Sequence, residues 1–432
     1  MTSQAPELQT KIRNWQMGVF AVTWSTYFTY YLCRMNFSVA QPMILEDPEF
    51  AHWNEAMIGV IPSVYSAFYA LGQFVNAQLG SRFGARRMML IGVSVIAVVN
   101  VVFSTVSNYY LMLTLWAING YCQSIGWPMI VQTMSNWFAV KRRGTMMGLV
   151  STCYSWGNAG AWLLGGWLCS EFGWRSSFWI PGLTMIPIAL AYLFFMRNTP
   201  EEVGLPHIRD DEEPEPESTD GAPAEDWTIW KVMRVTLTNK TLWLLGLSYF
   251  CFNAVRYAFM YWTPTYFKMY HHVDIKKGVF LAVAFPLIGS TGQIFAGYVS
   301  DKMLGGRRAP VCTVMLFILA LLCLAFIPLE AGETFMATVV IAAAGFMIYG
   351  PDAILTGAAA IDSAHPKAAA SAAGFIMAMG NLGAALYSGF GVGLILVLTD
   401  RNWTAVFISL AVLSLMAAGM AALLWNEKPK GT

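Results

Sequence analysis

Charge is scarce in this chain, and its scarcity excludes most soluble folds. Of 432 residues only 12% are Asp, Glu, Lys or Arg, about half the share of an ordinary soluble domain. The formal net charge is +1 and no basic block occurs, so nothing in the composition favours nucleic acid as a partner. Hydrophobic residues make up 56% of the chain. Repeated apolar segments of about 20 residues predict membrane-spanning helices instead.

The usual signatures of catalytic, metal and nucleotide chemistry are missing as well. The seven cysteines fall in predicted helices without the spacing of metal ligands, and the five histidines form no H-E-x-x-H motif. No G-x-x-x-x-G-K-[ST] loop occurs, which argues against an ATP-driven pump. The first apolar run is too long for a signal peptide and lacks a small-residue cleavage site. We therefore expect no enzyme, no cofactor and no metal.

Long apolar segments, separated by short polar loops, fill most of the chain. They predict an all-α integral membrane protein with twelve transmembrane helices, at 15–42, 57–79, 88–108, 110–136, 145–169, 176–196, 242–268, 278–299, 311–328, 334–361, 368–398 and 403–425. A polar stretch rich in Pro and Glu follows the sixth helix and cannot fold alone. The predicted domains are an N-terminal segment (1–14), a first six-helix half (15–196), an acidic linker (197–241), a second six-helix half (242–425) and a tail (426–432).

Lysine and arginine are distributed unevenly between the loops. If both termini are cytoplasmic, 19 of the 26 fall on the inner side, 5 on the outer side, and the remaining two are Arg34 and Arg256. Cytoplasmic loops of membrane proteins carry such an excess of positive charge. The bias therefore predicts that both termini are cytoplasmic.

Arg34 interrupts the first apolar run, where a charge is costly and marks a function or a partner. Tyr27, Tyr31 and Arg34 are spaced i, i+4, i+7, which places two phenols and a guanidinium on one helix face. A guanidinium offers a planar fork of donors and keeps its charge, so it can hold a phosphoryl group bidentately. This face is predicted to form part of an anion pocket.

The second half repeats these landmarks at a nearly constant offset. Arg256 corresponds to Arg34 at an offset of 256 − 34 = 222, and the same offset carries Tyr27 onto Tyr249 and Tyr31 onto Asn253. IGWP at 125–128 corresponds to IYGP at 348–351, and WRSSF and WTAVF open the last helix of each half. Two parallel six-helix repeats are the architecture of the major facilitator superfamily, which the chain resembles.

A loop motif typical of that superfamily, G-x-x-x-D-R/K-x-G-R/K-R/K, follows the second helix of each half. The second half keeps it with Asp301, Lys302, Arg307 and Arg308. In the first half Arg82 and Gly84 remain, whereas a serine replaces the acid. The motif is interpreted either as a charged latch at the cytoplasmic face or as ordinary positive anchors.

A more specific set of motifs is YYLCRMNF, GWPMIVQTMSNWF, VRYAFMYWTPTYF, GYVSDK, IYGP and AAASAAGF. Together they resemble the organophosphate:phosphate antiporters, which include bacterial glycerol-3-phosphate and hexose-phosphate transporters. In that family one arginine from helix 1 and one from helix 7 bind phosphate from both sides. The resemblance assigns these roles to Arg34 and Arg256.

Several charges of the family pattern are replaced here. Met35 stands where a lysine commonly follows the first arginine, Gln73 replaces a lysine of helix 2, and Tyr154 aligns with a histidine of helix 5. Gln73 and Tyr154 either hydrogen-bond the substrate or pack between helices. Asp352, in the middle of helix 10, is either a proton-coupling group or the structural counter-ion of Arg256.

The expected function is secondary transport of a small organic phosphate or phosphonate by alternating access, in exchange for inorganic phosphate. Arg34 and Arg256 would bind the anion, and Tyr27, Tyr31, Asn253, Gln73 and Tyr154 would line the cavity. The alternatives are a proton-coupled organic-anion symporter, which Asp352 favours, and a transporter-like receptor for sugar phosphates. The expected setting is the lipid bilayer of a bacterial inner membrane, with the protein as a monomer.

Overall fold

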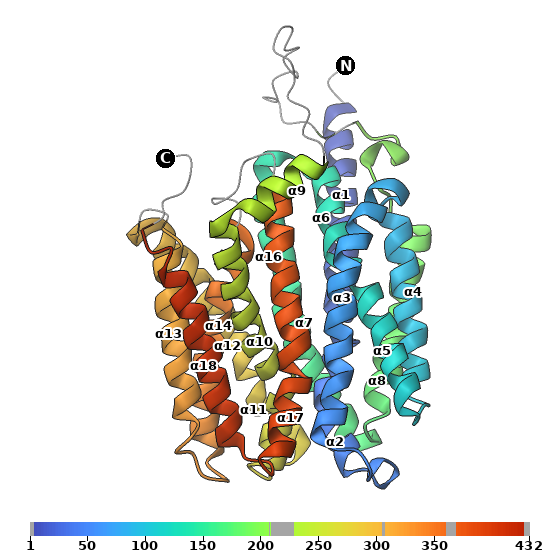
Figure 1. Cartoon of the computed structure of the whole chain (residues 1–432). Helices are drawn as coiled ribbons and strands as arrows, with labels where there is room; N and C mark the ends of the chain where they lie inside the picture. The colour runs from blue at the N-terminus through green and yellow to red at the C-terminus, as the bar shows by residue number, and fades with distance from the viewer. Residues whose placement is uncertain (1–3, 207, 209–228, 305–306, 360–368, 427–432) are drawn as a thin grey trace.

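The computed structural model describes residues 4–206, 208, 229–304, 307–359 and 369–426, and every regular element in these ranges is helical (Figure 1). The helices of the first half are α1 (Gln4–Leu32), α2 (Asn36–Glu46), α3 (Glu55–Phe83), α4 (Ala85–Phe103), α5 (Tyr109–Gln123), α6 (Gly126–Trp137), α7 (Val140–Phe172) and α8 (Ser176–Phe194). Those of the second half are α10 (Lys240–Met269), α11 (Ile275–Ala282), α12 (Ala284–Tyr298), α13 (Ala309–Ala325), α14 (Thr334–Ala353), α16 (Ala369–Gly383), α17 (Phe390–Leu398) and α18 (Trp403–Ala422).

Several neighbouring elements join end to end into one span. They are α1 with α2, α5 with α6, α11 with α12, α14 with the π-helical turn η4 (Ile354–Ala358), and α16 with η6 (Ala384–Ser388) and α17. The described helices then group into twelve spans, six before the linker and six after it. The predicted fold class is confirmed.

Six described spans are long and apolar enough to cross a membrane, judged by length and composition: Ala85–Phe103, Ser176–Phe194, Ile275–Tyr298, Thr334–Thr356, Ser371–Leu398 and Trp403–Ala422. Ala309–Ala325 is a shorter apolar helix. The less apolar spans include α1, α3, α7 and α10, which carry polar side chains toward the interface between the halves. Polar groups in spans face a bundle interior or a cavity because lipid cannot hydrogen-bond them.

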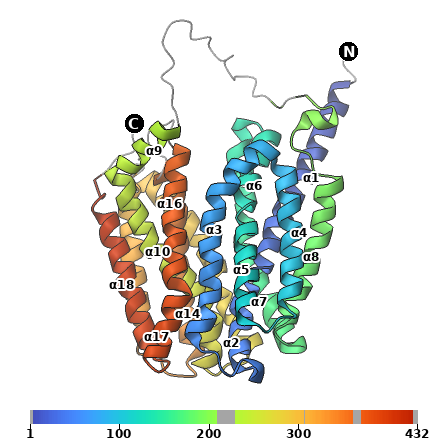
Figure 2. The same cartoon turned by 45° about the vertical axis from the view of Figure 1, so that its right-hand side comes forward.

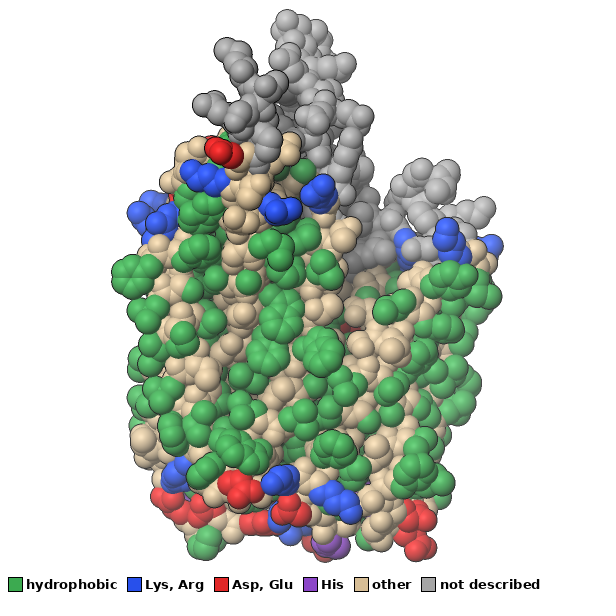
Figure 3. All heavy atoms as spheres, turned by 180° about the vertical axis from the view of Figure 1, so that it is seen from behind, with side chains coloured by type: hydrophobic (Ala, Val, Ile, Leu, Met, Phe, Trp, Pro, Cys, Tyr) green, Lys and Arg blue, Asp and Glu red, His purple; other side chains and the backbone are tan. Residues whose placement is uncertain are grey.

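The two halves lie side by side with their helices roughly parallel, as both ribbon views show (Figures 1 and 2). The described chain starts and finishes at the same end of the bundle, which we call the inner end; the opposite end is the outer end. On the face that Figure 3 shows, hydrophobic side chains cover the middle, and charged side chains gather toward the two ends. This distribution fits a bundle surrounded by lipid.

Polar side chains fix where several spans begin. Asn54, Asn108, Asn239, Asp274 and Asn402 each accept a hydrogen bond from a backbone N–H in the first turn of the helix that follows. Such N-caps satisfy donors that a helix start leaves unpaired. The loop sequences therefore set the span boundaries.

The linker region differs in part from the prediction. Residues 209–228, with most of the acidic stretch, and residues 427–432 of the tail lie outside the described residues. The end of the predicted linker, however, forms helix α9 (Ile229–Thr238). Its Thr236 side chain donates a hydrogen bond to Ser371 Oγ of α16 at 3.0 Å. Ile229–Thr238 directly follows the acidic segment, and the polar composition of the stretch as a whole predicts a linker without a helix.

Candidate functional site

A cavity of about 360 Å³ lies between the two halves, and each half supplies part of its wall. Aromatic and amide side chains dominate the lining, with two arginines and one carboxylate. The described lining residues are Tyr27, Tyr31, Arg34, Tyr69, Gln73, Trp127, Ser151, Tyr154, Tyr249, Asn253, Arg256, Tyr257, Gln293, Asp352, Ala353, Thr356, Met377 and Asn381. All seven residues predicted to bind substrate are therefore brought together, and Asp352 lies with them.

Arg34 lies at a break in the first span, where a continuous helix was predicted. Helix α1 ends at Leu32 and α2 begins at Asn36. The Cys33 carbonyl at the break accepts hydrogen bonds from Asn119 Nδ2 at 2.9 Å and Gln123 Nε2 at 3.3 Å. Broken helices are tolerated at membrane depth when neighbouring side chains satisfy the freed backbone groups. The amides of α5 do so here.

The Arg34 guanidinium is buried against aromatic rings. Its side chain stacks over Tyr31, with 3.8 Å from Cζ to the ring centroid, and lies 5.9 Å from the Tyr69 centroid. Arg34 is 4% exposed, and its Nε has no hydrogen-bond partner. Among the described residues no carboxylate pairs with it. A buried cation with an unpaired donor favours an anionic ligand.

Arg256 is held differently, within the continuous helix α10. Its Nη1 donates to Asp352 Oδ1 at 2.8 Å, and the Tyr249 hydroxyl donates to the same oxygen at 2.9 Å. All three residues are buried, with Arg256 and Asp352 each 8% exposed. Asp352 therefore pairs with Arg256, while a proton-coupling role for the same carboxylate stays a prediction.

Two polar contacts cross between the halves within the cavity wall. Gln293 Nε2 donates to the Tyr154 hydroxyl at 2.6 Å, and Asn381 Nδ2 donates to Gln73 Oε1 at 2.7 Å. Both predicted residues thus line the cavity and also join the halves. The sequence repeat relates Gln73 to Gln293 at an offset of 293 − 73 = 220, whereas no sequence pattern indicates Asn381.

The loop motif residues lie near the inner end, away from the cavity lining. Arg82 is in the last turn of α3, and Gly84 ends that helix with φ +78°, a conformation suited to glycine. Lys302 and Arg307 are exposed, and Arg308 Nη1 donates to Ser300 Oγ at 3.0 Å. The Asp301 side chain lies outside the described residues, so the latch interpretation remains a prediction.

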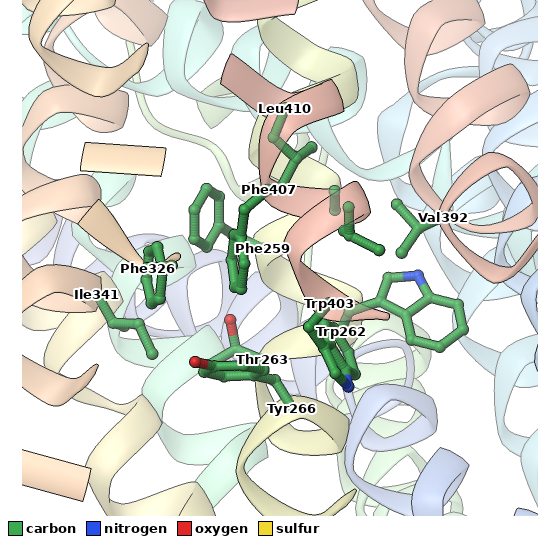
Figure 4. A pocket seen from close by; sticks show the side chains of 12 residues that line it. Phe259, Trp262, Thr263, Tyr266, Phe326, Ile341, Val392, Trp403, Phe407 and Leu410 are labelled. Carbon is green, nitrogen blue, oxygen red and sulfur yellow. The ribbon is translucent and has the colours of Figure 1, made fainter. Parts of the chain in front are cut away.

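A second, much smaller cavity of about 20 Å³ lies inside the second half (Figure 4). Aromatic rings of α10 and α18 surround it, including Phe259, Trp262, Trp403 and Phe407. Its size is near that of one water molecule. We interpret it as a packing gap within one half rather than a substrate site.

The outer end is closed by close helix packing. Gly59 of α3 lies against the backbone of Gly389, where an added Cβ would come within 2.4 Å of the Gly389 carbonyl oxygen. The Phe390 N–H donates to Ser63 Oγ at 2.8 Å across the same contact. Figure 3 shows a recess between the two lobes in the inner part of the bundle. The bundle is therefore closed at the outer end and hollowed between the lobes toward the end that holds both described termini.

Three ion pairs join the halves at the outer end. Each takes its carboxylate from the first half and its cation from the second: Glu46–Lys268 at 3.3 Å, Glu171–Lys276 at 3.1 Å and Glu55–Arg401 at 2.6 Å. We call these three pairs the outer clasp. Three of the five outer cations counted in the sequence, Lys268, Lys276 and Arg401, therefore contact the opposite half.

Comparison with known proteins shows which family has this architecture. The model of the Major Facilitator Superfamily matches residues 23–388, which is most of the chain. The chain belongs to the major facilitator superfamily. It is an integral membrane transporter-family protein rather than an enzyme.

Curated relatives of this superfamily protein match it over nearly its whole length. A probable hexose phosphate transport protein of Chlamydia pneumoniae is 28% identical, covering 98% of this chain and 94% of the relative. A glycerol-3-phosphate transporter of Bacillus subtilis is 29% identical, covering 95% and 92%. The membrane sensor protein UhpC of Salmonella typhimurium is 29% identical, covering 97% and 92%. These relatives confirm the resemblance that the motifs indicated.

Solved structures support the same fold at lower identity. A bacterial homologue of the human lysosomal transporter Spinster, in an inward-facing and unoccupied conformation, matches with a TM-score of 0.76 and 17% identity. That match covers 95% of this chain and 96% of the other. At this identity the likeness concerns the fold alone.

Proposed function

We propose that this major facilitator protein is a secondary transporter of a small organic phosphate or phosphonate. The observation that carries the proposal is Arg34, a buried guanidinium that faces the cavity between the halves without a carboxylate partner in the described chain. Arg256 lines the same cavity, so an anion between the halves can contact both arginines. The relatives named as hexose phosphate and glycerol-3-phosphate transporters support a phosphoryl group as that anion.

Alternating access supplies the mechanism. The substrate binds from the inner or the outer side, bridges the two halves and lowers the repulsion between the two arginines. The halves then rock about the site, which exposes it to the other side. Exchange for inorganic phosphate, a bacterial inner membrane, cytoplasmic termini and a monomer are parts of this proposal. The distribution of lysine and arginine supports the orientation.

Counterflow in proteoliposomes tests the proposal. Vesicles that contain the purified protein and are loaded with an unlabelled phosphate ester should accumulate the labelled ester, and loading with inorganic phosphate tests the exchange. Arg34→Lys is the inactive control. Failure of every phosphate ester and phosphonate to accumulate, with folded protein in the vesicles, would overturn the proposal.

A receptor for sugar phosphates is the second candidate, because the relative named as a membrane sensor is as similar as the transporters. A receptor binds the ester without moving it. Titration of the detergent-solubilised protein, run beside counterflow, separates the two. A proton-coupled symporter is separated by an imposed proton gradient, which changes its uptake and leaves simple exchange unchanged.

A further inference from the structure

The charged side chains of the cavity indicate which net charge its ligand should carry. The described lining contains no lysine or histidine; its charged groups are Arg34, Arg256 and Asp352. Two positive charges and one negative leave the site with a formal charge of +1. A phosphate ester with two negative charges would therefore leave an uncompensated negative charge at membrane depth, which is costly. A ligand with one net negative charge balances the site.

Asp352 places its negative charge where the phosphoryl group must bind. The carboxylate sits on Arg256 at 2.8 Å, so a phosphoryl group that approaches this guanidinium meets a like charge. Removing Asp352 from Arg256 would break an existing buried pair, which is itself unfavourable. A positive group on the ligand resolves the conflict, because it neutralises the carboxylate without displacing it.

The cavity wall also offers acceptors for such a positive group. Both hydrogen bonds to Asp352 use Oδ1, and Oδ2 accepts none from the described residues. Asn253 Oδ1 is buried without a partner. Tyr27, Trp127 and Tyr257 supply aromatic rings along the wall, whose faces attract ammonium groups. An ammonium group can donate three hydrogen bonds to surroundings of this kind.

We propose that the substrate is a zwitterion: a phosphate ester or phosphonate that carries an amine. Its phosphoryl group binds Arg34 and the free donors of Arg256, and its ammonium group binds Asp352, with Asn253 as a neighbouring acceptor. This inference rests on the proposed transport of organic phosphates and names their class. It also assigns Asp352 as the residue that determines specificity.

Three probes of matched length test it: 2-aminoethyl phosphate, 2-hydroxyethyl phosphate and ethyl phosphate. Their affinities are measured by titration of the full-length protein, and their exchange by counterflow. The wild type should prefer the amine to the hydroxyl compound by roughly tenfold or more, the value of a hydrogen bond to a charged group. Asp352→Asn should abolish this preference, and Asp352→Glu should retain part of it.

The outcomes separate the two proposals. If the hydroxyl or ethyl compound binds wild type at least as tightly as the amine, the zwitterion is wrong and organic phosphate transport stands. If none of the three binds folded wild type, while a wider panel of esters also fails, the proposed function itself is wrong. An amine preference that persists unchanged in Asp352→Asn would also refute the role of Asp352. Glu49→Gln, which changes a carboxylate to an amide outside the cavity on Arg175, should leave the preference in place and serves as the matched control.

Discussion

Arg34 and Arg256 occupy equivalent positions in the two halves, yet their surroundings differ. Arg34 lies at a helix break, stacked on Tyr31, without a carboxylate. Arg256 lies inside a continuous helix and is paired with Asp352. The two repeats thus hold one arginine without a carboxylate partner in the described chain and one arginine in an ion pair. The difference gives the cavity two distinguishable ends, which a substrate with two different ends requires.

The largest expected effect is the loss of the free cation. Arg34→Lys replaces the planar fork by a single ammonium group, which cannot bind a phosphoryl group bidentately. We expect transport to fall by roughly 100-fold or more, as two charged hydrogen bonds are lost. Proteoliposome counterflow measures this, with Arg175→Lys, outside the cavity on Glu49, as the matched control. Near wild-type rates in Arg34→Lys would contradict its role as the anion anchor.

Stability should rank the two arginines in the opposite order. Arg256→Met leaves Asp352 buried and unpaired, so we expect a loss of about 3–5 kcal/mol in the free energy of unfolding. Arg34→Met leaves no carboxylate behind and should cost much less. The double variant Arg256→Met/Asp352→Asn should recover most of the loss. Thermal unfolding of the purified protein provides the measurement, and equal destabilisation by both single variants would remove the distinction.

The surroundings of the two arginines also show how much of the site can be predicted from the sequence. Charges inside apolar runs and the repeat between the halves were sufficient to place both arginines, their tyrosines and Asn253 in one site. The break at Cys33 was not predictable, because it depends on side chains of α5 that are distant in sequence. The partner of Arg256 stayed open for a similar reason. Asp352 is far along the chain, and only the packing of α14 against α10 joins them.

A smaller effect is expected at the outer clasp, where the first half supplies the carboxylates and the second half supplies the cations. Glu171→Gln or Glu46→Gln removes one exposed ion pair, worth about 0.2–1 kcal/mol each. The combined variant should shift the protein toward an outward-open state, and raised salt should act in the same direction. Distances between spin labels at the exposed positions Tyr110→Cys and Glu330→Cys report the opening.

The clasp has an internal control. Glu49 pairs with Arg175 at 2.7 Å, but both belong to the first half, so Glu49→Gln should not open the outer end. The charge swap Glu171→Lys/Lys276→Glu should restore the wild-type distances. An equal shift in Glu49→Gln would mean that general surface charge, not the pairs between the halves, controls the opening.

The smallest effect concerns acid at the outer end, where the offset between the repeats relates Glu49 to His271. Burial lowers the pKa of His271, whose Nδ1 accepts a hydrogen bond from the Gly332 N–H at 3.1 Å. Because the folded protein favours the neutral ring, the unfolded chain binds more protons below its own pKa near 6.5. The stability that the neutral His271 ring contributes is therefore fully present above that pH and is lost as the pH falls toward the lowered pKa of the folded protein.

His271→Asn keeps an acceptor for the Gly332 N–H and cannot be protonated. It should flatten the decline in unfolding temperature between about pH 7 and pH 5 while leaving the value at neutral pH nearly unchanged. In the first half, Asp47 has a lowered pKa because hydrogen bonds from Trp174 and the Glu49 backbone, and the charge of Arg175, outweigh its burial. Its contribution is lost only at still lower pH. If the unfolding temperature of His271→Asn falls with pH as it does in the wild type, the carboxylates of the first half, and not His271, cause the decline.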